Sequence, residues 1–393
     1  MEKIILLLIT SIPIMYQIVG LKNTVYTDIQ YIPMLILNLA LIFHFYKNKV
    51  KLKKETVIIF LMLFMAGFVV PFVMSNVTQT MFMENLKYSG FYINFIVMII
   101  LLANYIVKDN YKKIIGSFLV GNTVILGINI IKNINNINLN KCIDNVIHLF
   151  KLLDKKEVLE FGFNHPNIAS LFIIMEIFLL YKFKQSFDNR NIYTNLSINV
   201  CMIILIIPLL ATGSRGAIIG GIAFCILNAF FWCFLKVKNY VKVIISTIII
   251  ALSCVLLAHM NFVQIIFSES MKIRLSDVSN LVYYLVENNK VITGLGPVNN
   301  TLSYAKTTGI ENTVDNGYLA FCAQYGIIGL GLILASLGYL FYSNFQIKNN
   351  ENCALILTLL IYSCVENVLF IPRVLMCLLV WIFIVNSDGV IPK

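Results

Sequence analysis

Charged residues are scarce in this chain. Only 12% of its 393 residues are Asp, Glu, Lys or Arg, whereas a soluble domain usually carries about 25%. Hydrophobic residues make up 59%, so too little charge is available to cover a surface in water. About 12 membrane spans of about 20 residues would use ~240 positions. The composition excludes a soluble enzyme, a disordered chain and a secreted disulfide scaffold, and it predicts a polytopic membrane protein.

Paired cysteine motifs are also absent. None of the nine cysteines forms a CxxC pair, and eight lie in or beside apolar runs, where Cys behaves as a small hydrophobic residue. We expect only Cys142 in an aqueous loop, and therefore neither a disulfide framework nor a metal site. A nucleotide-binding glycine loop, an internal repeat and a cytosolic domain are missing too. The first apolar run has no small-residue cleavage site after it, which predicts an uncleaved span.

Long apolar runs organise the sequence into a single integral membrane domain over 1–393. Their lengths suit helices that cross about 30 Å of hydrocarbon, and they lack the alternation of outer-membrane strands. The runs cover about 4–20, 30–46, 56–75, 88–107, 112–131, 164–183, 195–211, 215–235, 241–260, 316–343, 353–371 and 373–386. The predicted fold is an all-α bundle of about 12 transmembrane helices.

Lysine predicts the orientation of these spans. The formal net charge of +11 would suggest nucleic-acid binding in a soluble protein, but here the cations lie in short loops between apolar runs. Five lysines between 47 and 54 crowd the second loop, which makes that loop cytoplasmic. Every alternate loop after it is again basic. Both termini are therefore expected in the cytoplasm, and no nucleic-acid partner is expected.

Two predicted external loops are long, 132–163 and 261–315. In the second, Leu281 and Leu285 belong to an apolar pattern with helical spacing over 275–286, and a shorter pattern in the first includes Ile143 and Ile147. An apolar stripe beside a bilayer indicates a helix that lies on the membrane face or caps a cavity. Loops of this length are often functional.

Arginine is rare, and its placement runs against the lysine trend. Of four arginines, Arg190 is predicted to be cytoplasmic, whereas Arg215, Arg274 and Arg373 fall at the external face. External arginines can simply snorkel or pair with acids. A guanidinium group also binds phosphate oxygens through two parallel hydrogen bonds, which an ammonium group does not. We therefore predict a diphosphate site at the outer leaflet.

Arg215 lies in the sequence Ala211-Thr-Gly-Ser-Arg-Gly-Ala217, where one span ends outside and the next begins. Gly213 would allow a tight turn, and the helix start would add its amide groups and dipole to the arginine charge. Gly216 and Gly220 form a small-xxx-small pair, which favours close helix packing.

The segment Thr-Gly-Ser-Arg-Gly-Ala at the start of a span resembles the bacterial O-antigen ligase and polymerase superfamily. Two further segments resemble this family in their order: Phe161 to Asn167, with its His-Pro-Asn, and the stretch from Gly294 to Gly329, with Gly-Leu-Gly-Pro, Asp-Asn-Gly-Tyr-Leu and Tyr-Gly-Ile-Ile-Gly. The resemblance covers about 160–335. It implies a fold like that of membrane glycosyltransferases of the GT-C class, in a bacterial cytoplasmic membrane.

The resemblance also implies an activity: a polysaccharide polymerase that transfers an oligosaccharide from polyprenyl diphosphate to another lipid-linked repeat at the external face. Membrane lipid, a chain-length regulator and a flippase would be its partners. Ligases of the family typically have His where this chain has Asp315, which favours a polymerase over a ligase. The site would be metal-independent and need no cofactor, because fixed cations can neutralise the departing diphosphate.

Roles for individual residues follow from this chemistry. Arg215 and Arg274 would bind the diphosphate, and Asp315 or His165 would act on the acceptor proton. The expected substrate-binding residues are Ser214, Asn167, Asp277, Asn316, Tyr318 and Arg373.

Structural alternatives stay open for several of these residues. Asp315 could cap the following helix, as could Asn316; His165 could be a polar anchor; and Asp277 could pair with Arg274.

Two carboxylates inside predicted spans, Glu176 and Glu366, are functional candidates by position. A structural pair of Glu366 with Arg373 is the alternative. At the level of the whole chain, the rival functions are a ligase for another acceptor and a transporter or flippase of lipid-linked sugars.

Overall fold

The structure of the chain is a computed structural model. It describes residues 1–22, 28–70, 79–140, 142–145, 158–187, 192–234, 279–296, 316–364 and 366–386. The helices in this part of the chain are α1 (Glu2–Gly20), α2 (Tyr31–Asn48), α3 (Lys54–Phe64), the π-helical turn η1 (Met65–Val69), α5 (Gln79–Tyr105), α6 (Lys108–Lys132), the short 3-10 helix η2 (Ile134–Asn136), α8 (Pro166–Gln185), α9 (Ile192–Ala211), α10 (Arg215–Phe234), α15 (Gly317–Gln346), α16 (Asn350–Tyr362) and α17 (Leu375–Val385).

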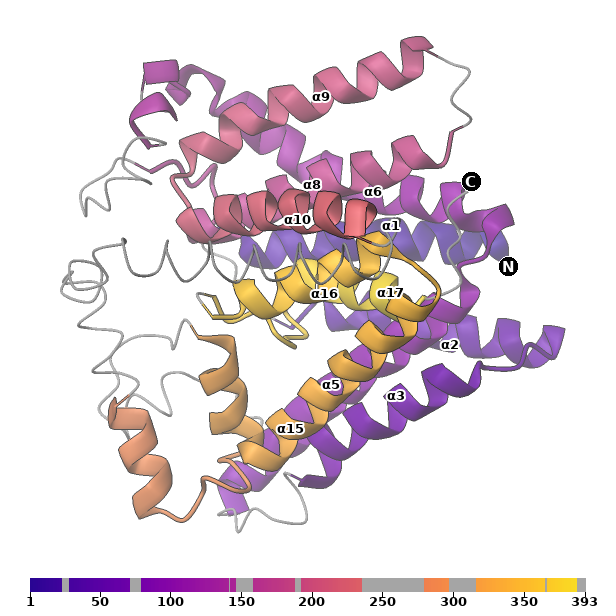
Figure 1. Ribbon diagram of the computed structural model, residues 1–393, viewed down its shortest axis with the longest axis vertical. Helices are drawn as coiled ribbons and strands as arrows, with labels where there is room; N and C mark the ends of the chain where they lie inside the picture. The colour runs from indigo at the N-terminus through magenta and orange to yellow at the C-terminus, as the bar shows by residue number, and fades with distance from the viewer. Residues whose placement is uncertain are drawn as a thin grey trace.

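The described ranges contain helices and no β-strand. Seven of these helices are long and apolar enough to cross a membrane. The predicted all-α polytopic membrane protein is confirmed to that extent. The count of 12 spans stays a prediction, and the run 241–260 lies outside the described residues. Figure 1 shows α1, α6, α8, α10 and α16 running in roughly one direction, whereas α3, α5 and α15 cross the view obliquely.

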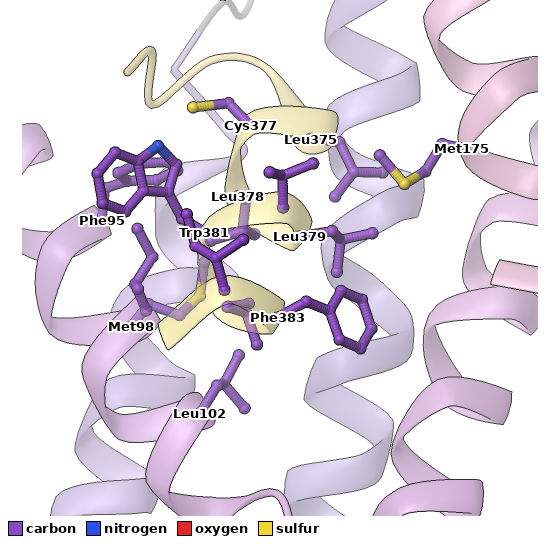
Figure 2. Close-up of a cluster of buried hydrophobic side chains, with 14 of the residues drawn as sticks. Phe95, Met98, Leu102, Met175, Leu375, Cys377, Leu378, Leu379, Trp381 and Phe383 are labelled. Atoms are coloured by element: carbon purple, nitrogen blue, oxygen red, sulfur yellow. The ribbon is translucent and has the colours of Figure 1, made fainter. Parts of the chain in front are cut away.

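The core of the bundle surrounds α17. This helix is apolar on every side, and every residue of it except Met376 is buried, as expected for a helix enclosed by other helices. Trp381 and Leu378 lie among side chains of α5 such as Phe95 and Met98, while Met175 of α8 closes the other side (Figure 2). The indole N–H of Trp381 donates to the carbonyl of Leu369 at 3.0 Å, so the polar atom of this side chain is satisfied inside the core.

The bundle has two distinct ends. At one end, which we call the lysine-rich end, Lys113 pairs with Glu2 at the starts of α6 and α1, and Asn386 after α17 donates to the carbonyl of Ile106 after α5. The opposite end carries Arg215, and we call it the Arg215 end. There the N–H of Asn164 donates to the carbonyl of Gly20 at 2.8 Å, and the N–H of Leu159 to that of Ala211 at 3.1 Å. The arrangement agrees with the alternation that lysine predicts.

Two predicted spans differ from the structure between 353 and 386. The helix α16 ends at Tyr362 rather than near 371, and α17 is only 11 residues long. At 1.5 Å per residue, these helices measure about 20 Å and 16 Å, less than the ~30 Å hydrocarbon thickness. The connection 363–374 is non-helical in its described residues, and Val368, Leu369 and Phe370 in it are buried. Non-helical backbone at membrane depth is stable when protein covers it.

The predicted span 316–343 is broken at Gly326, whose φ of 67° and ψ of −178° are non-helical. The segment 291–296 supplies the hydrogen bonds that the break removes. Leu295 and Gly296 donate to the carbonyls of Ala323 and Gln324, and Ile327 donates to that of Val291. We call this pairing the glycine clasp, because a Cβ at Gly294 or at Gly326 would strike the backbone of the facing segment.

The predicted amphipathic helix of the second external loop is present over 279–287. Its buried side chains, Leu281 and Leu285, pack with Ala323 of α15, while Val282 and Val286 are exposed. The two leucines of the predicted stripe therefore face α15. In the first loop, residues 142–145 are helical. Cys142, which we expected in water, is instead buried, and its Sγ lies 3.6 Å from the carbonyl oxygen of Ile207 in α9.

Candidate functional site

Three helices, α8, α10 and α15, begin at the Arg215 end beside the connection 363–374. Each start has a local cause in the sequence. Pro166 occupies the first position of α8, where its missing N–H costs nothing. Gly213, with φ of 60°, turns the chain from α9 into α10. Asn316 caps α15.

His165 is the N-cap of α8. Its Nδ1 accepts from the backbone N–H of Asn167 at 3.2 Å, which supports the structural alternative for this residue. A neutral imidazole that accepts at Nδ1 carries its hydrogen on Nε2. In this arrangement His165 can offer a hydrogen-bond donor to a ligand, and its catalytic role stays a prediction.

Asn167 reaches from α8 to the connection after α16. Its Nδ2 donates to Oε1 of Glu366 at 2.8 Å. The bond joins two segments 199 residues apart in sequence, and it fixes one oxygen of a carboxylate that sequence analysis had placed inside a span. The predicted substrate-binding residue Asn167 thus has a protein partner at this site.

Gly216 gives Glu366 its space on the α10 side. An ideal Cβ at Gly216 would stand 3.0 Å from Cγ of Glu366 and 3.0 Å from Cε2 of Tyr362. An ideal Cβ at Gly220, one turn later, would stand 3.4 Å from the same tyrosine ring. The small-xxx-small pair therefore lets α10 approach α16 closely, as predicted, and brings Arg215 at the start of α10 next to the Glu366 region.

The start of α15 lies on a further side of the Glu366 region. The side-chain oxygen of Asn316 accepts from the N–H groups of Tyr318 and Leu319 at 3.1 Å and 3.0 Å, and its Nδ2 donates to the carbonyl of Cys364 at 3.0 Å. The N–H of Gly317 donates to the carbonyl of Ser363 at 2.8 Å. The helix cap is therefore Asn316 rather than Asp315.

Together these contacts place Glu366 where α8, α10, α15 and the end of α16 meet. We refer to Asn167, Arg215, Gly216, Asn316 and Glu366 as the Glu366 cluster. Three helix starts supply partial positive charge, Arg215 supplies a full one, and Glu366 supplies an acceptor. Such an arrangement can bind an anion beside a carboxylate. In the sequence, Glu366 is a candidate only through its position within an apolar run; its neighbours depend on the fold.

Arg373 belongs to a separate group. Its guanidinium lies 3.2 Å from Oδ1 of Asp28, whose other oxygen accepts from Lys87 at 2.6 Å. The ring of Tyr88 lies 5.7 Å from the guanidinium carbon. This ion-pair partner comes from the loop before α2 and supports a structural role for Arg373. The pairing of Arg373 with Glu366 stays a prediction.

The remaining predicted residues divide into two sets. Ser214 is buried, with 2% of its surface exposed, and its hydroxyl has no hydrogen-bond partner among the described residues. The hydroxyl of Tyr318 donates to the carbonyl of Leu360 at 2.7 Å, so this side chain holds α15 against α16. Arg274, Asp277 and Asp315 lie outside the described residues, and their roles stay predictions.

In the described ranges, no three His, Cys, Asp or Glu side chains gather as metal ligands would. Comparison with known proteins adds no assignment: no protein-family model and no curated protein sequence matches this chain.

Proposed function

We propose that this chain is a polysaccharide polymerase of the bacterial cytoplasmic membrane, with a GT-C-like fold of about 12 spans. It would join oligosaccharide repeats carried on polyprenyl diphosphate at the external face. The observation that carries the proposal is the meeting of three helix starts and Arg215 around Glu366, at the end opposite the lysine-rich loops.

The main requirement of this transfer reaction is a site that stabilises the negative charge of the departing diphosphate. The bond between the anomeric carbon and the diphosphate oxygen breaks, and the anomeric carbon forms a new bond to an acceptor hydroxyl. Charge then grows on the departing diphosphate, where preorganised donors act most strongly. Arg215 and the starts of α8 and α10 are such donors. The resemblance over 160–335 supports the same reading, and it assigns Arg274 to the diphosphate and Asp315 to the acceptor proton.

The first alternative keeps the reaction and changes the acceptor, as in a ligase. The absence of His at position 315 favours the polymerase. A deletion strain distinguishes the two, because a missing polymerase leaves single repeats on the lipid, whereas a missing ligase leaves complete polymer on it.

A second alternative, a transporter of lipid-linked sugars, has one structural observation in its favour. The helix α15 is broken at Gly326, and the non-helical 363–374 joins two short helices. Discontinuous helices of this kind are common at transporter binding sites, where they lie near the bilayer midplane. The Glu366 cluster lies instead where α8, α10 and α15 begin, which favours a site at the membrane surface.

Arg215→Lys tests the proposal by complementation of a deletion strain. We expect the loss of most polymer, since an ammonium group lacks the planar fork, with protein abundance unchanged. Arg373→Lys is the matched control at the same end of the bundle, and we expect it to retain polymer because its partner is Asp28. Full-length polymer from Arg215→Lys would reject the diphosphate role.

A further inference from the structure

Outside the Glu366 cluster, a buried carboxylate, Glu176, takes part in a network that joins α1, α6 and α8. Figure 1 shows these three helices. Oε2 of Glu176 accepts from Nδ2 of Asn122 at 2.8 Å, and Oε1 lies 2.5 Å from the hydroxyl of Thr123. Gln17 donates to Oδ1 of Asn122 at 2.8 Å and also to the Asn122 backbone carbonyl. Glu176 is ten residues from the start of α8, or about 15 Å along the helix, and so near its middle.

The side chains that surround Glu176 are neutral in the described elements packed on α8, and α9, which packs along α8, carries no charged residue. From α6 come Asn122 and Thr123, and α1 contributes Gln17 through Asn122. Next to Glu176, α10 presents Gly221 to Ile174, and α17 presents Phe383 to Phe178. The nearest lysine on α8 itself, Lys182, pairs with Glu351 instead. In the described chain, no cation balances a negative charge on Glu176.

The count of hydrogens limits what Thr123 can donate. Thr123 has one hydroxyl hydrogen, yet its oxygen lies 2.7 Å from the carbonyl oxygen of Leu119 and 2.5 Å from Oε1 of Glu176. If Thr123 donates to Leu119, an ionised Glu176 would face it with lone pair against lone pair. A carboxylic acid removes the conflict by donating its own proton to the Thr123 oxygen.

The amide groups leave no other donor for Glu176. Both N–H bonds of Gln17 are directed to Asn122, and Asn122 uses one N–H for the carbonyl of Phe172 at 3.0 Å and one for Glu176. With the Thr123 hydrogen directed to Leu119, the network offers the carboxyl group one N–H donor and one hydroxyl acceptor. A carboxylic acid then satisfies both, whereas a carboxylate satisfies only the first.

Glu351, at the lysine-rich end, is the natural contrast. It is also buried, but it pairs with Lys182, and the hydroxyl of Tyr181 donates to it at 2.9 Å. Gln185 is a further donor. A buried carboxylate with a cation and two neutral donors is stable in its ionised form. The partners of Glu351 thus favour its ionised form, whereas the neutral partners of Glu176 favour its protonated form.

From this geometry we propose that Glu176, with Gln17, Asn122 and Thr123, forms a proton-binding site inside the membrane, and that its carboxyl group holds a proton at neutral pH. A titratable carboxyl group in mid-membrane is the kind of residue that proton relays use. The proposal is independent of the polymerase reading, because none of these residues belongs to the Glu366 cluster.

Chemical labelling of the full-length protein tests the proposal. Dicyclohexylcarbodiimide dissolves in apolar phases and adds to protonated carboxyl groups, and Thr123 is exposed on the side of the bundle from which it can approach. After treatment at neutral pH, peptide mapping by mass spectrometry should find the adduct on Glu176 and not on Glu351. Label on Glu351 with none on Glu176 would overturn the proposal.

The thermal stabilities of Glu176→Gln and Glu351→Gln give an independent test without labelling. Glutamine is neutral and can donate to Thr123 as the carboxylic acid does, so Glu176→Gln should melt close to the original protein. Glu351→Gln leaves Lys182 buried without its counter-charge and should lower the melting temperature by several degrees. A decrease for Glu176→Gln as large as that for Glu351→Gln would show that Glu176 is ionised.

Discussion

At the scale of single residues, the position of Glu366 depends on neighbours that are distant in sequence. Asn167 holds one carboxylate oxygen, and Gly216 leaves room for the side chain. The sequence predicted Glu366 as a candidate because a carboxylate within an apolar run is costly. It could not predict Asn167 as the partner, since 199 residues separate the two and the non-helical path of 363–374 decides where Glu366 points.

Some residue roles were predictable because they depend on local geometry. The capping role of Asn316 and the turn at Gly213 follow from side-chain length and backbone freedom alone. The choice between Asp315 and Asn316 as the cap required the structure, because helix ends are uncertain by one or two residues. The sequence likewise left two alternatives for His165, a polar anchor or a catalytic group, and did not predict its contact with Asn167.

Gly216→Ala tests the importance of space at the Glu366 cluster. The new methyl group would stand 3.0 Å from Glu366 and Tyr362, so the carboxylate must move and its bond to Asn167 should weaken. We expect polymer formation in cells to fall several-fold, with a loss of about 1 kcal/mol in stability. Gly338→Ala is the matched control, since its methyl group would meet nothing within 4 Å. Equal activity of both variants would contradict the arrangement.

At the scale of elements, the apolar runs located most helices well but did not reveal their breaks. Hydropathy reports that 316–343 is apolar, and it is, although Gly326 divides α15 and 291–296 pairs with the break. Similarly, the apolar composition of 363–374 reflects the burial of this segment, although its described residues are not helical. A buried irregular segment and a buried helix have the same composition, and the difference lies in contacts with other elements.

Gly326→Ala tests the glycine clasp. The ψ near 180° with positive φ is accessible essentially only to glycine, at a cost of about 1–3 kcal/mol for another residue, and the new Cβ would also strike the carbonyl of Ile292. We expect 291–296 to detach, which hydrogen exchange would report as faster exchange of the Leu295 and Gly296 amides. Gly331→Ala, in open space five residues later, should leave that exchange unchanged. Protected amides in Gly326→Ala would show that the clasp does not depend on this backbone conformation.

At the scale of the whole molecule, the sequence predicted which helix ends lie together. Lysine placement predicted the two faces, and contacts at each end agree with it: Lys182 joins Glu351 at the lysine-rich end, and Asn167 joins Glu366 at the Arg215 end. The helix α8 is therefore tied to the start of α16 at one end and to the connection after α16 at the other. The positive-inside rule assigns the lysine-rich end to the cytoplasm, so the Glu366 cluster should face outward.

Cysteine accessibility checks this orientation. In a variant whose nine cysteines are replaced by serine, we would introduce Lys22→Cys at the Arg215 end or Lys51→Cys at the lysine-rich end. A membrane-impermeant maleimide should label the first in intact cells and the second only after the cells are opened. The reverse pattern would place Arg215 in the cytoplasm and remove the basis for an external transferase.

The most direct measurement is reconstitution of the purified protein in liposomes that contain defined oligosaccharide repeats on polyprenyl diphosphate, followed by sizing of the glycans. We predict a ladder of products longer than one repeat, which shortens to single repeats for Arg215→Lys and persists for Arg373→Lys. Repeats that move between the leaflets while staying single would contradict the polymerase and identify a transporter instead.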